Sequence, residues 1–102
     1  MGLNYSGEYD EVNEESYVSG PVTVGAVAVE AKVGASALAG RQTVRIYNSS
    51  GGIVYFGPSG VTTTTGEPLK KKQWVSIPAG ASVGVFLIRA SGSGDVIVQE
   101  MG

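Results

Sequence analysis

Residues 43–56 read TVRIYNSSGGIVYF, and this stretch decides the fold class of the chain. Residues 43–47 alternate polar and apolar side chains with a period of two, which is typical of a β-strand with one buried face. Residues 49–52 are a serine and glycine cluster, and residues 53–56 form a short, wholly apolar run. The stretch therefore predicts two strands joined by a turn.

The rest of the chain repeats this organisation. We expect further strands at residues 22–24, 27–33, 74–77, 82–90 and 96–98, with glycine and serine clusters between them. The alternation changes parity at Gly25-Ala26, where a β-bulge would fit. No segment has a helical period with caps. The sequence predicts an all-β fold, a small antiparallel β-sandwich or jelly-roll-like barrel. The expected core residues are Val44, Ile46, Val75, Ile77, Val83, Val85, Leu87, Val96 and Val98.

Charge divides the chain near Gly20-Pro21. Residues 1–20 contain five carboxylates and no lysine or arginine, whereas residues 21–102 carry a net charge of +3, so the whole chain carries −2. The first part has no strand period but contains three tyrosines, which disordered tails usually lack. We therefore predict an extended acidic N-terminal arm over residues 1–20, which docks on another chain, and a β-sandwich body over residues 21–102.

The composition argues against catalysis. The chain has no histidine and no cysteine, which excludes the Ser-His and Cys-His nucleophile systems, and the body has few carboxylates. The glycine-rich stretch 55–69 is not a phosphate-binding loop, because Glu67 stands where that loop needs a lysine. Its threonine run, residues 62–65, predicts a rigid excursion, part loop and part short edge strand. We expect no enzyme activity and no cofactor-binding or metal-binding residue.

Lys70, Lys71 and Lys72 are the one basic cluster. They could protect an exposed edge strand from aggregation, bind an acidic protein surface or bind nucleic acid. Three lysines give too few phosphate contacts for strong nucleic-acid binding. Trp74, with Tyr47, could form a sugar-stacking platform, or it could pack in the core or an interface.

Partner binding is therefore the expected function of the polar and aromatic residues. Since no apolar run approaches the roughly 20 residues that span a bilayer, we expect no membrane partner. Since the net charge is only −2 and the basic cluster has three lysines, we expect no nucleic-acid partner. The predicted partner-binding residues are Tyr5, Tyr9, Tyr17, Glu14, Glu15, Lys70, Lys71, Lys72 and Trp74.

Several motifs follow one another along the chain within residues 22–100. A strand with the sequence GRQTVRIYN (residues 40–48) precedes a loop, which begins Tyr-x-Gly-x-Ser-Gly-Val-Thr (residues 55–62) and continues to Gly-x-Pro-Leu (residues 66–69). A strand with Ser-Ile-Pro-Ala-Gly (residues 76–80) follows. This pattern resembles small β-sandwich structural proteins of tailed bacteriophage virions, namely capsid decoration, head-fibre and neck or tail accessory proteins. The acidic arm lies outside the resemblance.

The resemblance implies a non-enzymatic virion component, assembled in the host cytoplasm, with no catalytic residues. The first expectation is a capsid decoration protein, a homo-oligomer that binds the major capsid protein or other virion proteins through its arm and sandwich. The alternatives are a neck or tail adaptor or fibre-base component and, from another class, a carbohydrate-binding adhesin domain.

Overall fold

Residues 17–102 are described by the computed structural model and contain eight β-strands and no helix. The all-β prediction is therefore confirmed. The strands are β1 (Tyr17–Val24), β2 (Val29–Glu30), β3 (Thr43–Tyr47), β4 (Val54–Gly57), β5 (Glu67–Leu69), β6 (Trp74–Pro78), β7 (Phe86–Ile88) and β8 (Gly94–Met101).

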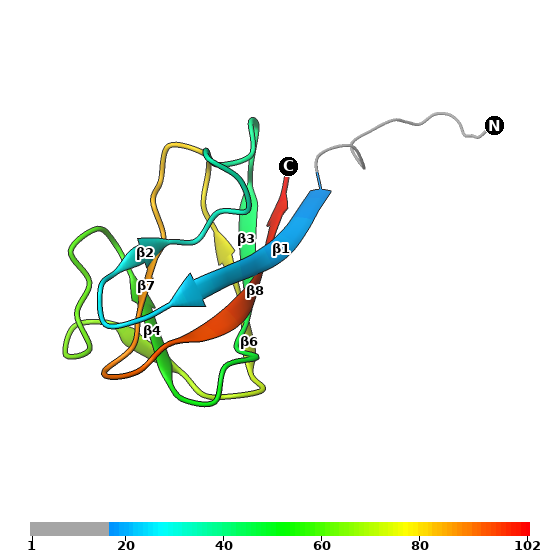
Figure 1. Cartoon of the computed structure of the whole chain (residues 1–102). Coiled ribbons are helices and arrows are strands. Elements are labelled where there is room, and N and C mark those ends of the chain that lie inside the picture. The colour runs from blue at the N-terminus through cyan, green and yellow to red at the C-terminus, as the bar shows by residue number, and fades with distance from the viewer. Residues whose placement is uncertain (1–16) are drawn as a thin grey trace.

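The strands form two antiparallel four-stranded sheets (Figure 1). The first sheet has the order β1-β8-β3-β6 and the second has the order β2-β7-β4-β5. Each sheet thus contains two of the pairs β1–β8, β2–β7, β3–β6 and β4–β5, as happens when one long hairpin is wound around a barrel. This is the order of a jelly roll, so the predicted sandwich or jelly-roll-like architecture is confirmed.

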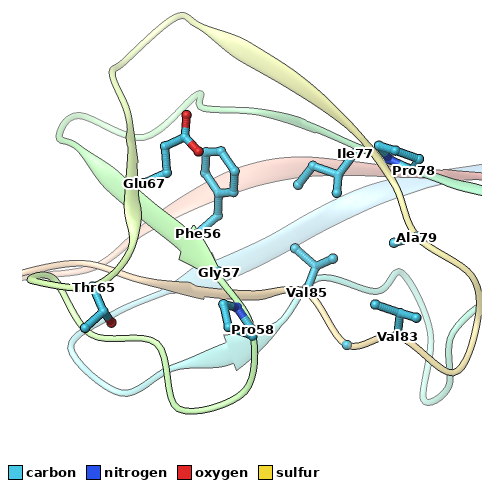
Figure 2. Close-up of a pocket in the computed structure, with 11 residues that line it drawn as sticks. Phe56, Gly57, Pro58, Thr65, Glu67, Ile77, Pro78, Ala79, Val83 and Val85 are labelled. Carbon is cyan, nitrogen blue, oxygen red and sulfur yellow. The ribbon is translucent and has the colours of Figure 1, made fainter.

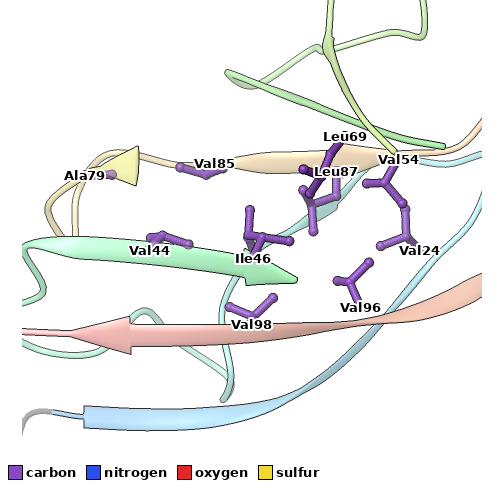
Figure 3. Close-up of a cluster of buried hydrophobic side chains, with 11 residues drawn as sticks. Val24, Val44, Ile46, Val54, Leu69, Ala79, Val85, Leu87, Val96 and Val98 are labelled. Atoms are coloured by element: carbon purple, nitrogen blue, oxygen red, sulfur yellow. The ribbon is translucent and has the colours of Figure 1, made fainter. Parts of the chain in front are cut away.

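The core lies between the two sheets, because each strand turns alternate side chains inward. Figure 3 shows Ile46 of β3 between Val98 of β8 and Leu87 of β7, and all three are fully buried. Val44, Val85 and Val96 are also buried, as predicted. The remaining three predicted core residues differ. Val75 and Ile77 are only half-buried, and Val83 is 54% exposed.

These differences have local causes. Val75 and Ile77 lie on β6, an edge strand that has a neighbour on one side only. Val83 belongs to the loop before β7, where its N–H donates to Gly80 O at 3.1 Å in a turn. The predicted strand 82–90 is therefore reduced to the three residues of β7.

The N-terminal boundaries also differ from the prediction. Gly25-Ala26 is not a bulge, since it belongs to the loop that carries the chain from the first sheet to the second. Only two residues of the expected strand 27–33 form β2. Strand β1 begins at Tyr17, and its register with β8 runs from Tyr17–Met101 through Gly20–Val98. Residues 17–20 of the predicted arm therefore belong to the sheet.

Prolines mark the edges of both sheets. Pro21 lies in β1, Pro78 in β6 and Pro68 in β5, and all three of these strands are outermost in their sheets. Proline has no backbone N–H to donate to a neighbouring strand. It is tolerated in an edge strand, because one side of that strand has no neighbour. The threonine run before β5 is a turn and not a strand. Thr62 Oγ1 accepts the N–H groups of Thr64 and Thr65 at 3.2 and 3.1 Å.

A buried ion pair ties two long loops to β8. Arg41 Nη1 donates to Glu100 Oε2 at 2.7 Å, and both side chains are almost completely buried. The same guanidinium donates to the carbonyls of Ala79, Gly80 and Val83 in the β6–β7 loop. The pair thus supplies hydrogen bonds to backbone groups that no strand partner satisfies.

Candidate interaction surfaces

An apolar row crosses the outer face of the first sheet, and we call it the aromatic row. The strand registers place Pro21 of β1 opposite Ile97 of β8, Ile97 opposite Tyr47 of β3, and Tyr47 opposite Trp74 of β6. Trp74 is 57% exposed and Tyr47 is 39% exposed. Large exposed side chains of this kind, aligned on one face of a sheet, are typical of a binding surface.

Arg45 packs against Trp74 at one end of the aromatic row. Its guanidinium carbon lies 4.3 Å from the centre of the Trp74 ring, within the range of a cation–π contact. Arg45 therefore covers part of one face of the indole, and the side chain as a whole stays more than half exposed. Tyr17 lies on the same sheet face, since it alternates along β1 with Pro21, and it is 51% exposed. The sheet thus brings the predicted residues Tyr17 and Trp74 onto one surface from opposite edges.

The second candidate surface is the end of the sandwich where the β3–β4, β5–β6 and β7–β8 loops meet. We call it the basic pole and define it by Lys70, Lys71, Lys72 and Arg89. The three lysines are exposed in the loop between β5 and β6, the edge strands of the two sheets, and do not lie on an edge strand itself. Two hollows lie side by side here. Gly51, Gly52, Ile53, Lys70 and Lys71 line one of about 320 Å³, and Gly52, Ile53, Tyr55, Arg89, Ala90 and Ser91 line one of about 240 Å³.

Asn48 organises the loops of the basic pole. This residue is fully buried, and its side-chain amide donates to Gly52 O and Leu69 O, each at 2.8 Å. Its backbone carbonyl accepts the N–H of Lys72 at 2.7 Å, and its backbone N–H donates to Gln73 O at 2.8 Å. One side chain therefore fixes the lysine loop against the β3–β4 loop.

Lys72 has an unusual backbone conformation. Its φ is +66°, in the left-handed region that glycine and asparagine adopt more easily than lysine. Such a conformation costs of order 1–3 kcal/mol for an ordinary residue and is kept only where the surroundings impose it. Here the hydrogen bond from Lys72 N–H to Asn48 O is part of that constraint. This unfavourable conformation makes Lys72 a candidate for a functional role.

A third hollow opens at the side of the sandwich, between the free edges of β5 and β6. Its volume is about 400 Å³, within the range of small-molecule sites. Figure 2 shows Phe56, Ile77 and Val85 around this space, with the carboxylate of Glu67 beside the Phe56 ring. Its lining is mainly apolar because the two sheets separate here and expose the margin of the core.

Some of the predicted partner-binding residues lie outside the described part of the chain, and the candidate surfaces also contain residues that were not predicted. Tyr5, Tyr9, Glu14 and Glu15 lie outside the described residues. Trp74 and Tyr17 share the sheet face, while the three lysines lie at the basic pole. Arg45, Asn48 and Arg89 are among the contributors that were not predicted as partner-binding residues, and Tyr47 was expected only as part of a sugar-stacking platform with Trp74. The period of residues 43–47 already places Arg45 and Tyr47 on one face, but no local pattern marks Asn48 or Arg89.

Within residues 17–102, no three metal-binding side chains cluster together. The same range contains no helix long and apolar enough to cross a membrane. No family model, curated protein or solved structure matches this chain.

Proposed function

We propose that this chain is a non-enzymatic structural protein of a tailed-phage virion, a capsid decoration protein that forms homo-oligomers and attaches to the major capsid protein. The observation that carries the proposal is the aromatic row, an apolar stripe across the outer face of the first sheet, where few side chains are charged. Tyrosine and tryptophan supply most of the binding energy in many protein interfaces. The motif order of residues 40–80 supports the virion context.

The jelly-roll order adds a weaker argument. Jelly rolls occur in viral capsid proteins, in lectins and in enzymes of the cupin type. A fold alone does not assign a function, so this likeness is an analogy. It is compatible with a shell protein and equally with a carbohydrate-binding domain, and the surface must separate the two.

Quantitative mass spectrometry of purified particles from the phage that encodes the chain tests the proposal. A decoration protein is expected in a copy number that matches the capsid lattice, on the order of hundreds for each particle. A dozen copies or fewer would place the protein at the neck or tail and overturn the decoration role. Absence from the particle would overturn the virion proposal altogether.

Trp74→Ala tests the aromatic row directly. We expect it to weaken binding to particles that lack this protein by about 2 kcal/mol, because truncating a tryptophan that anchors an interface typically costs this much. The fold should persist, since the ring is mostly exposed. Binding would be measured by co-sedimentation with particles across a protein concentration series.

Val27→Ala is the matched control. Val27 is 80% exposed but lies in the β1–β2 loop, away from the aromatic row. It should bind particles as the unchanged protein does. Equal binding by both variants would show that the row is not the attachment surface.

Sugar binding is the second candidate function, favoured by the exposure of Trp74 beside Tyr47, because neighbouring aromatic side chains can stack against a sugar ring. A glycan screen of the full-length protein separates it from the first. Binding to a defined glycan that is lost in Trp74→Ala, in a protein that shows no binding to particles, would favour the adhesin.

A further inference from the structure

The basic pole and the start of β1 lie at opposite ends of the sandwich. Tyr17 begins β1 beside Met101, near the C-terminus of the chain. Val24 ends β1 beside Gly94, where an added Cβ would lie 2.6 Å from Arg89 Nη1. Strand β1 has eight residues, so these ends are about 23 Å apart. Figure 1 shows the start of β1 and the C-terminus together, away from the β3–β4 and β7–β8 loops.

The Arg89 side chain packs against two glycines of the basic pole. Its guanidinium lies against Gly52 and Gly94, where added Cβ atoms would be 2.7 and 2.6 Å from its nitrogens. Any other residue at these two positions would push the guanidinium out of place. The side chain is half-buried, and no ion pair to it occurs within residues 17–102. A partly desolvated arginine without a carboxylate favours an anionic partner.

The pole also has an apolar component. Ile53 is exposed and lines both neighbouring hollows, one beside Lys70 and Lys71 and the other beside Arg89 and Tyr55. A partner that fits must therefore present carboxylates together with apolar or aromatic side chains. A purely anionic polymer would meet the cations and leave Ile53 without a contact.

The first 16 residues of the same chain have this chemistry. They contain no lysine or arginine, two tyrosines (Tyr5 and Tyr9) and five carboxylates: Glu8, Asp10, Glu11, Glu14 and Glu15. We propose that residues 1–16 of one copy bind the basic pole of the next copy, in a head-to-tail contact. This inference rests on the proposed assembly function, for which it specifies the contact between copies.

The positions of the two ends favour a contact between copies over one within a copy. Residues 1–16 join the sandwich at Tyr17, so reaching their own pole requires the chain to reverse and to run back about 23 Å. Their extended reach of about 53 Å would allow this, but a neighbour needs no reversal. The contact joins two different surfaces, so it is heterologous and produces rings or open chains of copies.

Sedimentation velocity of the full-length protein is the first test. We expect species larger than the monomer that grow with protein concentration and diminish at high salt, because charge pairs near a surface are screened. A protein that stays monomeric at every concentration and salt would overturn the inference.

A charge exchange identifies the contact. Glu14→Lys/Glu15→Lys and, separately, Lys70→Glu/Lys71→Glu should each weaken self-association about tenfold or more, because each makes like charges meet. An equimolar mixture of the two variants should associate, since each supplies the charge that the other now requires. Lys32→Glu is the control, because Lys32 lies away from the pole and pairs with Glu30 at 3.4 Å. It should leave association unchanged.

The remaining outcomes also decide the question. If the mixture does not associate, or if Lys32→Glu weakens association as much as the pole variant, the pole is not the docking site. If the wild type is monomeric and its pole binds single-stranded DNA instead, a nucleic-acid site replaces the proposal. Monomeric protein that is nevertheless present in particles would remove this inference and the homo-oligomer part of the proposed function, and it would leave the virion role standing. Head-to-tail association of a protein that is absent from particles would remove the proposed function alone.

Discussion

Glu100→Gln is expected to lower the free energy of unfolding by about 3–5 kcal/mol. The change removes the only carboxylate that pairs with Arg41 within the described residues, and it does so at a site where both side chains are almost fully buried. The guanidinium would then remain in the interior without a counterion, which is the costly case for a buried pair.

The loss extends beyond the ion pair. Glu100 also accepts the N–H of Val33 at 3.0 Å and the N–H of Leu38 at 3.2 Å, both in the loop between β2 and β3. A glutamine can keep one such acceptor, but its amide nitrogen cannot accept the other. We therefore expect this loop to exchange its amide hydrogens faster in the variant, in addition to the global loss of stability.

Glu100 should also make the free energy of unfolding depend on pH under acidic conditions. Burial by itself raises the pKa of Glu100, but the hydrogen bonds from Val33, Arg41 and Leu38 outweigh it and hold the pKa below its ordinary value of 4.5. The unfolded chain therefore binds a proton more readily than the folded chain. The stabilisation is complete above pH 4.5 and is lost as the pH falls from there through the folded pKa.

Urea unfolding at a series of pH values measures both effects. Glu100→Gln should be less stable at neutral pH and should lose less further stability on acidification than the wild type. Glu30→Gln is the matched control, because Glu30 pairs with Lys32 at a partly exposed site and should change stability by less than about 0.5 kcal/mol. Equal stability of the two variants would contradict the role assigned to the Arg41–Glu100 pair.

Ile46→Ala should cost about 2–5 kcal/mol of unfolding free energy. Ile46 is fully buried near the middle of β3, and it belongs to the cluster that joins the two sheets, where Figure 3 places it between Leu87 and Val98. Removing three carbons there loses the transfer free energy of the side chain and leaves a cavity. The strands around it are held by hydrogen bonds on both sides, since β3 pairs with β6 and β8. The site therefore has little freedom to collapse.

Val83→Ala provides the comparison for Ile46→Ala. Val83 was expected in the core from the sequence but is 54% exposed in a loop, so its truncation should cost less than about 0.5 kcal/mol. Denaturant melts of both variants give the two values under the same conditions. A cost below about 0.5 kcal/mol for Ile46→Ala would contradict the assignment of β3 and its inward face.

The candidate surfaces could be predicted from the sequence in part. Trp74 and the three lysines stand out by residue type, and the period of residues 43–47 sets Arg45 and Tyr47 on one side of a strand. That Tyr47 meets Trp74 depends on the pairing of β3 with β6, whose residues are 27 positions apart at this point. Nothing near Arg89 in the sequence indicates that its guanidinium lies against Gly52 and Gly94.

The sequence by itself determined those features that depend only on residues close together in the chain. The period of two settled that the chain forms strands and which side chains of β3 and β8 point inward, because alternation is a local property of an extended backbone. A glycine or proline marks the end of four of the eight strands, namely β1, β4, β6 and β8. The absence of histidine and cysteine limited the chemistry of the whole chain.

Only the tertiary structure decided what depends on residues far apart in the chain. Tyr17 and the next three residues look like part of an acidic arm, yet they form a strand because β8 provides a partner for them. Val83 has the pattern of a core residue, yet Arg41, 42 positions away, binds its carbonyl and holds it in a loop. Arg41 and Glu100 meet across 59 positions. A local pattern records the preference of a segment, but the contacts that override it form only when distant strands pair and the core between the two sheets closes.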